Sequence, residues 1–228
     1  MSIAEKLKTV AENEQRVFDA GKRAEYDRFW DDYQQNGNRT DYTNGFGGCW
    51  SAETFKPKYS MRPTTAYMML RYMRAKVDLV EHLKSLGVTL DFSNCTNFQY
   101  TFYGSQFTRV GVIDISKANN NNVQTMFGSC GNLETVDRLI VNENQVINFF
   151  SSASSLTNLK IEGVIGQNVD IHHSPLSVES MKGIFSCLKD YSATGGTHTV
   201  TFKADRETLL TDEEKSAATE KGWTLVWS

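Results

Sequence analysis

Apolar and polar positions recur in the same order three times in the second half of the chain. The three stretches are Phe102–Ile115, Phe127–Val141 and Phe150–Ile161. Each runs from an aromatic residue through a small polar loop to spaced apolar residues and then a short apolar alternation. The aromatic residues are spaced by about 25 residues, which lies within the range of leucine-rich repeats. This period predicts a solenoid, whose stacked repeats share a core and leave one long face of strands free to bind.

The apolar alternation predicts a strand in each repeat. These strands centre on Ile113–Ile115, Leu139–Val141 and Leu159–Ile161, and Val88–Phe92 predicts one more strand before them. A shorter alternation at Val169–Ile171 breaks the spacing and is typical of a terminal repeat.

After the repeats the pattern changes to alternating helices and strands. A helix is predicted over Ser177–Lys189, a strand over Thr197–Phe202, a helix over Thr211–Lys221 and a last strand over Trp223–Trp227. Glu214 lies three residues after Thr211, which is the spacing of a capping box. We therefore expect a βαβ-like C-terminal cap.

The first segment, from Ile3 to about Gln35, is highly charged and has helical spacing. Its apolar stripe keeps spacings of four and three residues and consists of Ile3, Leu7, Val10 and Val17. A lone helix with this much charge is not stable in water. Two alternatives stay open: the helix packs on its own domain, or it associates with copies of itself as a short coiled coil, most simply a trimer.

Between this helix and the repeats, turn-forming residues precede a second helical pattern. Residues 36–63 are rich in Asn and Gly and predict an ordered connector, and Thr64 or Thr65 can cap a helix that ends at Gly87. This helix would cover the first open repeat. The chain then divides into a charged helix (1–35), a connector with a capping helix (36–87), leucine-rich repeats (88–175) and a C-terminal cap (176–228). The predicted fold is α/β.

Composition excludes several classes of function. The net charge of −3 does not favour nucleic acid or an anionic membrane surface, and no apolar stretch is long enough to span a bilayer. The N-terminal residues lack the pattern of a secretory signal peptide. The four cysteines are far apart, and we expect buried free thiols rather than a disulfide framework.

The sequence offers little support for catalysis. It has no HExxH, GxSxG, P-loop or GxGxxG motif, and its paired carboxylates lie in charged helical patterns. His172 and His173 precede Pro175, where a polar loop is favoured over a metal site. We therefore expect no enzyme activity, no metal and no cofactor.

The repeats resemble a known family. Their Phe-x-x-Gly/Ser-Cys/Ser pattern, followed by spaced Leu, Val and Ile, resembles the BspA-like leucine-rich repeats of bacterial surface and phage-associated proteins. Further stretches are similar to a subset from phages and prophages of gut bacteria: Phe107–Asp114, Leu176–Lys182, Leu210–Lys215, Lys221–Leu225, and Ile3–Lys6 and Phe29–Tyr33 with Phe55–Tyr59. The resemblance implies a structural and adhesion role in a phage tail, baseplate or fibre.

These observations predict a non-enzymatic tail- or baseplate-associated protein, made in the bacterial cytoplasm and carried in the virion. Its partners would be other tail proteins, copies of itself, and a protein or glycan on the host surface. The alternatives are a cellular surface or secreted adhesin of the same repeat type and, as a residual, an uncharacterised enzyme. The outward positions of the predicted strands are the ligand-face candidates: Thr89, Asp91, Asp114, Ser116, Arg138, Ile140, Asn142, Lys160, Glu162 and Asp170.

Overall fold

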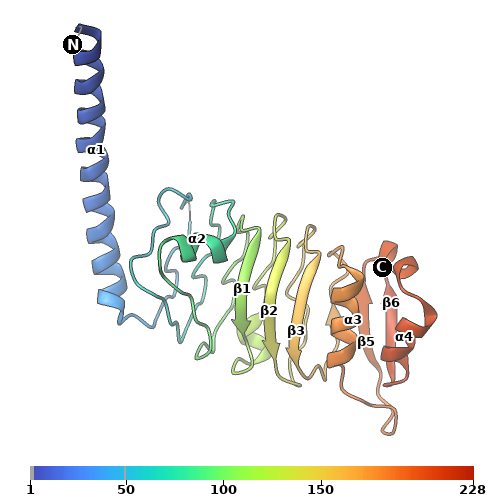
Figure 1. Ribbon diagram of the computed structural model, residues 1–228. Helices are drawn as coiled ribbons and strands as arrows, with labels where there is room; N and C mark the ends of the chain where they lie inside the picture. Colours follow the sequence, from blue (N-terminus) through green and yellow to red (C-terminus); the bar gives the residue numbers. More distant parts are fainter. Residues whose placement is uncertain (1–2, 49) are drawn as a thin grey trace.

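A computed structural model describes residues 3–48 and 50–228, and within the first helix the side chains of residues 3–8, 10, 11, 15, 18 and 19 are not described. The first helix, α1 (Ile3–Gln34), projects from the body of the molecule, and the rest of the chain forms coils that stack toward the C-terminus (Figure 1). A short 3-10 turn, η1 (Gln35–Gly37), follows α1.

The base of α1 is fixed to the body by its last two turns. Trp30 and Gln34 are fully buried. The Gln34 side chain donates to the Tyr59 carbonyl oxygen (2.8 Å) and accepts from the N–H groups of Lys58 and Tyr59 (both 2.8 Å). The C-terminal end of the helix therefore packs on its own chain.

The stacking of coils begins at Tyr42, well before the predicted repeats. The Tyr42 N–H donates to the Thr65 oxygen (3.0 Å), and the Ala66 N–H donates to the Asn97 oxygen (2.8 Å). The same bond recurs one coil further on, from the Phe98 N–H to the Asn122 oxygen (2.6 Å). Each coil thus satisfies backbone groups of its neighbour, as buried backbone requires.

The helix predicted from Thr64 or Thr65 is wrong over most of its length. Met68 and Tyr72 have φ values of 56° and 57°, in the left-handed region that a right-handed helix cannot include. The helix α2 is confined to Leu79–Ser85. Asp78 is its N-cap, and the Asp78 side chain accepts a hydrogen bond from the Glu81 N–H (3.1 Å). The apolar residues before it line the interior of a coil instead.

Three parallel strands occupy the centre of the stack. They are β1 (Arg109–Asp114), β2 (Thr135–Val141) and β3 (Asn158–Gly163), paired in that order, and η2 (Asn120–Val123) lies between the first two. Their buried residues are in register: Val110 with Val136 and Leu159, and Ile113 with Leu139 and Ile161.

The aromatic residue of each predicted repeat lies in one column behind this sheet. The rings of Phe102 and Phe127 are stacked with centroids 5.0 Å apart, and those of Phe127 and Phe150 are 5.1 Å apart. All three rings are buried. The three sequence stretches therefore occupy equivalent places in successive coils.

The C-terminal part forms a second parallel sheet with helices in its crossovers. Its strands pair in the order β4 (Val169–Asp170), β5 (His198–Phe202) and β6 (Trp223–Trp227). Between them lie α3 (Val178–Cys187), η3 (Ala204–Leu209) and α4 (Asp212–Thr219). The predicted βαβ arrangement and the Thr211–Glu214 capping box are both confirmed. The architecture is mixed α/β with two small parallel sheets over a continuous core.

The strand predicted over Val88–Phe92 does not extend the first sheet. Leu90 forms a single parallel bridge with Met61, on the side away from β1. A bridge between Asp78 and Arg109 starts a strand beside β1, but the chain then turns outward into α2. As a result, β1 is an edge strand next to a helix.

Candidate binding surfaces

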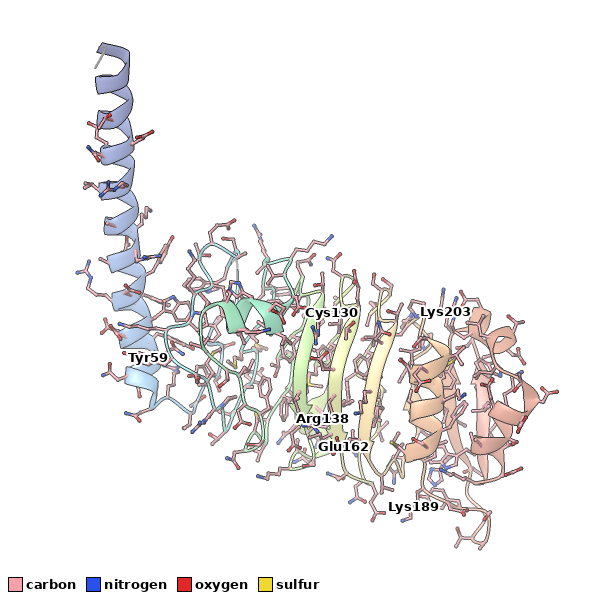
Figure 2. The ribbon with its side chains drawn as sticks, viewed as in Figure 1. Tyr59, Cys130, Arg138, Glu162, Lys189 and Lys203 are labelled. Carbon is pink, nitrogen blue, oxygen red and sulfur yellow. The ribbon has the colours of Figure 1, made fainter. Side chains whose placement is uncertain are left out.

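Five of the predicted ligand-face residues lie together on the outer face of the first sheet. Asp114 is in register with Ile140 and Glu162, while Arg138 and Lys160 belong to the same two neighbouring strands. Arg138 Nη1 lies 3.1 Å from Glu162 Oε2, and Figure 2 labels this pair. The face carries charges of both signs around a half-buried isoleucine, which suits recognition of a polar surface.

Four candidates at or near strand ends hold the turns that follow them. The Oδ1 atoms of Asp91, Asp114, Asn142 and Asp170 each accept a hydrogen bond from the backbone N–H two residues later, at distances of 2.9, 3.0, 2.9 and 3.3 Å. This is the geometry of an Asx turn. Hydrogen bonds from Ser93 lower the pKa of Asp91. One oxygen of each of these side chains is therefore already hydrogen-bonded within the fold.

The other candidates are more scattered. Ser116 donates its hydroxyl to Asp114 Oδ1 (2.6 Å), and its carbonyl oxygen accepts from Asn142 Nδ2 (2.6 Å). Thr89 lines a groove together with residues of α2 and β1, and Asp170 belongs to the second sheet. The ten positions thus follow the stack rather than converge on one point.

A groove that the sequence did not reveal lies between α2 and β1. It has a volume of about 490 Å³ and is lined largely by apolar side chains, including Leu79, Leu83, Val88, Leu90 and Val112. Val112 is 42% exposed there. No local pattern in the sequence marks this groove, because helical spacing of apolar residues runs through residues 64–78 as well as through α2.

The β1 edge that faces this groove is open. The Ile115 N–H donates to the Ile140 oxygen of β2 (2.9 Å), so alternation points the backbone groups of Val112 and Asp114 the other way. In the part of the chain that the structure describes, no strand pairs with this edge beyond Arg109. An open edge beside apolar side chains offers main-chain bonds to an extended polypeptide.

The predicted oligomerisation stripe lies on the projecting part of α1. The side chains of Ile3, Leu7 and Val10 lie outside the described residues, and Val17 is 73% exposed. Near the C-terminal end of the helix, Asp31 contacts Lys58 Nζ (2.6 Å) and the Tyr59 hydroxyl (2.5 Å). Figure 2 labels Tyr59 at this base.

The cysteine and histidine side chains of the described region have surroundings typical of structural residues. Burial raises the pKa of the Cys95 and Cys130 thiols to about 11, which disfavours the nucleophilic thiolate. Cys187 is also a free thiol and is half-buried, while Cys49 lies outside the described residues. His172 Nδ1 contacts Asp170 Oδ1 (2.5 Å), but no metal-binding group of three or more His, Cys, Asp or Glu occurs among the described residues.

None of the described helices is long and apolar enough to cross a membrane. No family model, curated protein or solved structure matches this chain. Any function proposed for the chain therefore has to come from its own residues and their geometry.

Proposed function

We propose that this chain is a short leucine-rich-repeat solenoid that acts as a non-enzymatic structural and adhesion protein of a phage or prophage tail or baseplate. The observation that carries the proposal is the coil-to-coil stack behind an exposed parallel sheet. Such a stack presents a long rigid face without needing a catalytic centre. The sequence resemblance to phage-associated BspA-like repeats supports the same class.

The repeat geometry supports the solenoid part of the proposal. Equivalent apolar residues of three coils are in register, and the phenylalanine column passes through all three. The base of α1, whose Trp30 packs on Phe46 of the first coil, and the second sheet then act as the two covers of a short array, because end repeats must present a different surface from inner ones.

The projecting helix supports the structural part of the proposal. A long charged helix that projects from its own domain gains stability by packing against a copy of itself or against another protein. In this proposal α1 attaches the protein to copies of itself, most simply as a trimer, or to another tail protein. The strand face then points toward a host-surface protein or glycan.

The particle itself provides the test. We expect the chain to co-sediment with phage particles purified on a density gradient from an induced lysogen, and tail or baseplate genes to flank its gene. A matched uninduced culture is the control. If the chain stays in the cell-free supernatant, or its gene lies in a housekeeping operon, the virion assignment is contradicted.

A cellular surface or secreted adhesin is the second candidate, because the same strand face would serve it equally well. Detection of the chain on intact cells of a strain that releases no phage particles would favour this candidate.

A further inference from the structure

Four tyrosines and one arginine form a cluster on the return segments of the coils, in a part of each repeat that the strand-face prediction does not include. The tyrosine–arginine cluster consists of Tyr67, Arg71, Tyr72, Tyr100 and Tyr103. Tyr72 is 47% exposed and the other four are half-buried. The cluster spans two neighbouring coils.

Neighbouring rings of the cluster lie edge to face, with interplanar angles of 84°, 74° and 80°. The ring centroids of Tyr72 and Tyr103 are 5.5 Å apart, those of Tyr100 and Tyr103 5.7 Å, and those of Tyr67 and Tyr100 6.4 Å. The Arg71 guanidinium carbon lies 4.6 Å from the Tyr72 centroid and 5.6 Å from that of Tyr103. The cation is thus surrounded by aromatic rings.

Glycines of the next coil hold two of these rings in place. A Cβ atom added at Gly104 would lie 2.5 Å from Tyr72 Cδ1, and one added at Gly128 would lie 2.9 Å from Tyr103 Cδ2. Each ring therefore rests directly on a glycine, and a larger residue would displace it. A surface fixed in this way loses little conformational entropy when it binds.

The charge of Arg71 is not neutralised within the described residues. Its guanidinium donates to the Tyr72 hydroxyl (3.2 Å) and to Met68 Sδ (3.3 Å), which is a weak acceptor, and its Nε has no partner. By contrast, Arg109 pairs with the carboxylates of Asp78 and Asp137. Charge complementarity at Arg71 therefore calls for an anion.

Backbone bonding argues against an extended peptide as the ligand. The Met68 N–H donates to the Gln99 oxygen (2.9 Å), and the Tyr72 N–H donates to the Tyr103 oxygen (2.8 Å). These coil-to-coil bonds occupy the main-chain groups that strand addition would need. Binding must use ring faces, phenol hydroxyls and the guanidinium.

We propose that the tyrosine–arginine cluster binds an acidic saccharide. A sugar ring can lie against the exposed phenol ring of Tyr72, beside the Arg71 guanidinium. The carboxylate or phosphate of the saccharide receives charge-assisted hydrogen bonds from Arg71. This site names the ligand class for the host-surface recognition proposed above and rests on that function.

Calorimetric titration of the full chain tests the site. The probes are trigalacturonate as the carboxylated saccharide, pentamannose 6-phosphate as the phosphorylated one, and maltotriose as the neutral control. We expect at least one acidic probe to bind, with affinity that falls as salt is added, and maltotriose to bind at least about tenfold more weakly. Comparison of the two acidic probes identifies the anion.

Variants test whether the cluster itself binds. Arg71→Gln and Tyr103→Ala should each weaken acidic-probe binding at least about tenfold, whereas Arg206→Gln on η3, outside every proposed binding surface, should leave it unchanged. Tyr103→Phe keeps the ring and serves if the alanine variant unfolds; it should retain most of the affinity. Melting curves verify that each variant is folded.

Three results would overturn the proposal: neither acidic probe binds at millimolar concentration, Arg71→Gln binds as the wild type does, or Arg206→Gln abolishes binding. Particle co-sedimentation is independent of these titrations. A chain that is found in virions but ignores acidic saccharides contradicts only this inference, and one that binds them but is absent from particles contradicts the virion assignment.

Discussion

Residues in the left-handed backbone region define the return segments of the coils. They recur at similar places in successive coils and include Asn44, Met68, Tyr72, Tyr100, Thr125 and Ser129. Such residues end any helix, yet most of them are not the glycine or asparagine that usually signals this conformation. Thr125 is the least suited, because its branched side chain is strained at φ 54°.

Thr125→Asn should stabilise the protein. Asparagine tolerates the left-handed region, as Asn44 does at φ 53°. The change should therefore raise the free energy of unfolding by about 0.5–1 kcal/mol. Urea denaturation measures it. Gln124→Asn is the control, since Gln124 has ordinary extended dihedrals (φ −56°, ψ 136°) and is exposed. A destabilised Thr125→Asn protein would contradict this account of strain.

At the scale of elements, strong periodicity and capping made most of the second half predictable. The strands β1, β2 and β3 repeat one apolar pattern, and α4 begins with a complete capping box. The first half was less predictable, because its coils are joined by hydrogen bonds that leave no period in the sequence. Between residues 64 and 78, apolar spacings of three and four fill a coil interior and imitate a helix.

The same limits apply to the candidate surfaces. Alternation correctly placed Arg138, Ile140 and Glu162 on one exposed face. It could not reveal that Asp91 and Asp114 hold turns, because that depends on the backbone two residues later. The α2–β1 groove and the tyrosine–arginine cluster arise between coils, so no local pattern marks them.

The anchor of α1 should depend on pH. Hydrogen bonds from Lys58 and Tyr59 lower the pKa of Asp31 in the folded protein below its ordinary value of 3.8. The stabilisation is therefore present above about pH 4 and is lost as pH falls through the lower folded pKa. Wild type should melt at a higher temperature than Asp31→Asn at pH 6, and the difference should shrink as pH falls below about 4. A difference that stays constant as pH falls through this range would contradict the anchor.

Self-association through α1 should be measurable in solution. The full chain should form an oligomer at micromolar concentration, and Val17→Asp should shift it toward the monomer by placing a charge in the apolar stripe. Analytical ultracentrifugation measures the mass. Asn13→Asp adds the same charge to another exposed position of α1 and is the control. A monomeric wild-type chain would contradict the attachment role in its self-associating form.

At the scale of the whole molecule, one core runs from the base of α1 to the last sheet. It extends from Trp30 to Trp223 without a break. Bridges between Ile147 and Val169 and between Ile165 and Leu188 connect the central coils to the C-terminal sheet. We therefore expect the body to unfold as a unit.

Phe127→Ala tests this continuity, because it removes the middle ring of the phenylalanine column. The loss should be about 3–5 kcal/mol of unfolding free energy, as is typical of a large buried ring. Val112→Thr, at an exposed position of β1, should change stability by less than about 0.5 kcal/mol. Equal losses at the two positions, measured by urea denaturation, would show that the column does not connect the coils.

The proposed place of the chain in a phage tail can be examined on the particle itself. The measurement is immunogold electron microscopy of purified particles, with antibody raised against the full chain. We predict gold at the tail tip or baseplate of particles and none on particles from a strain that lacks the gene. Unlabelled tails, together with labelled surfaces of cells that release no particles, would contradict the claim and favour the cellular adhesin.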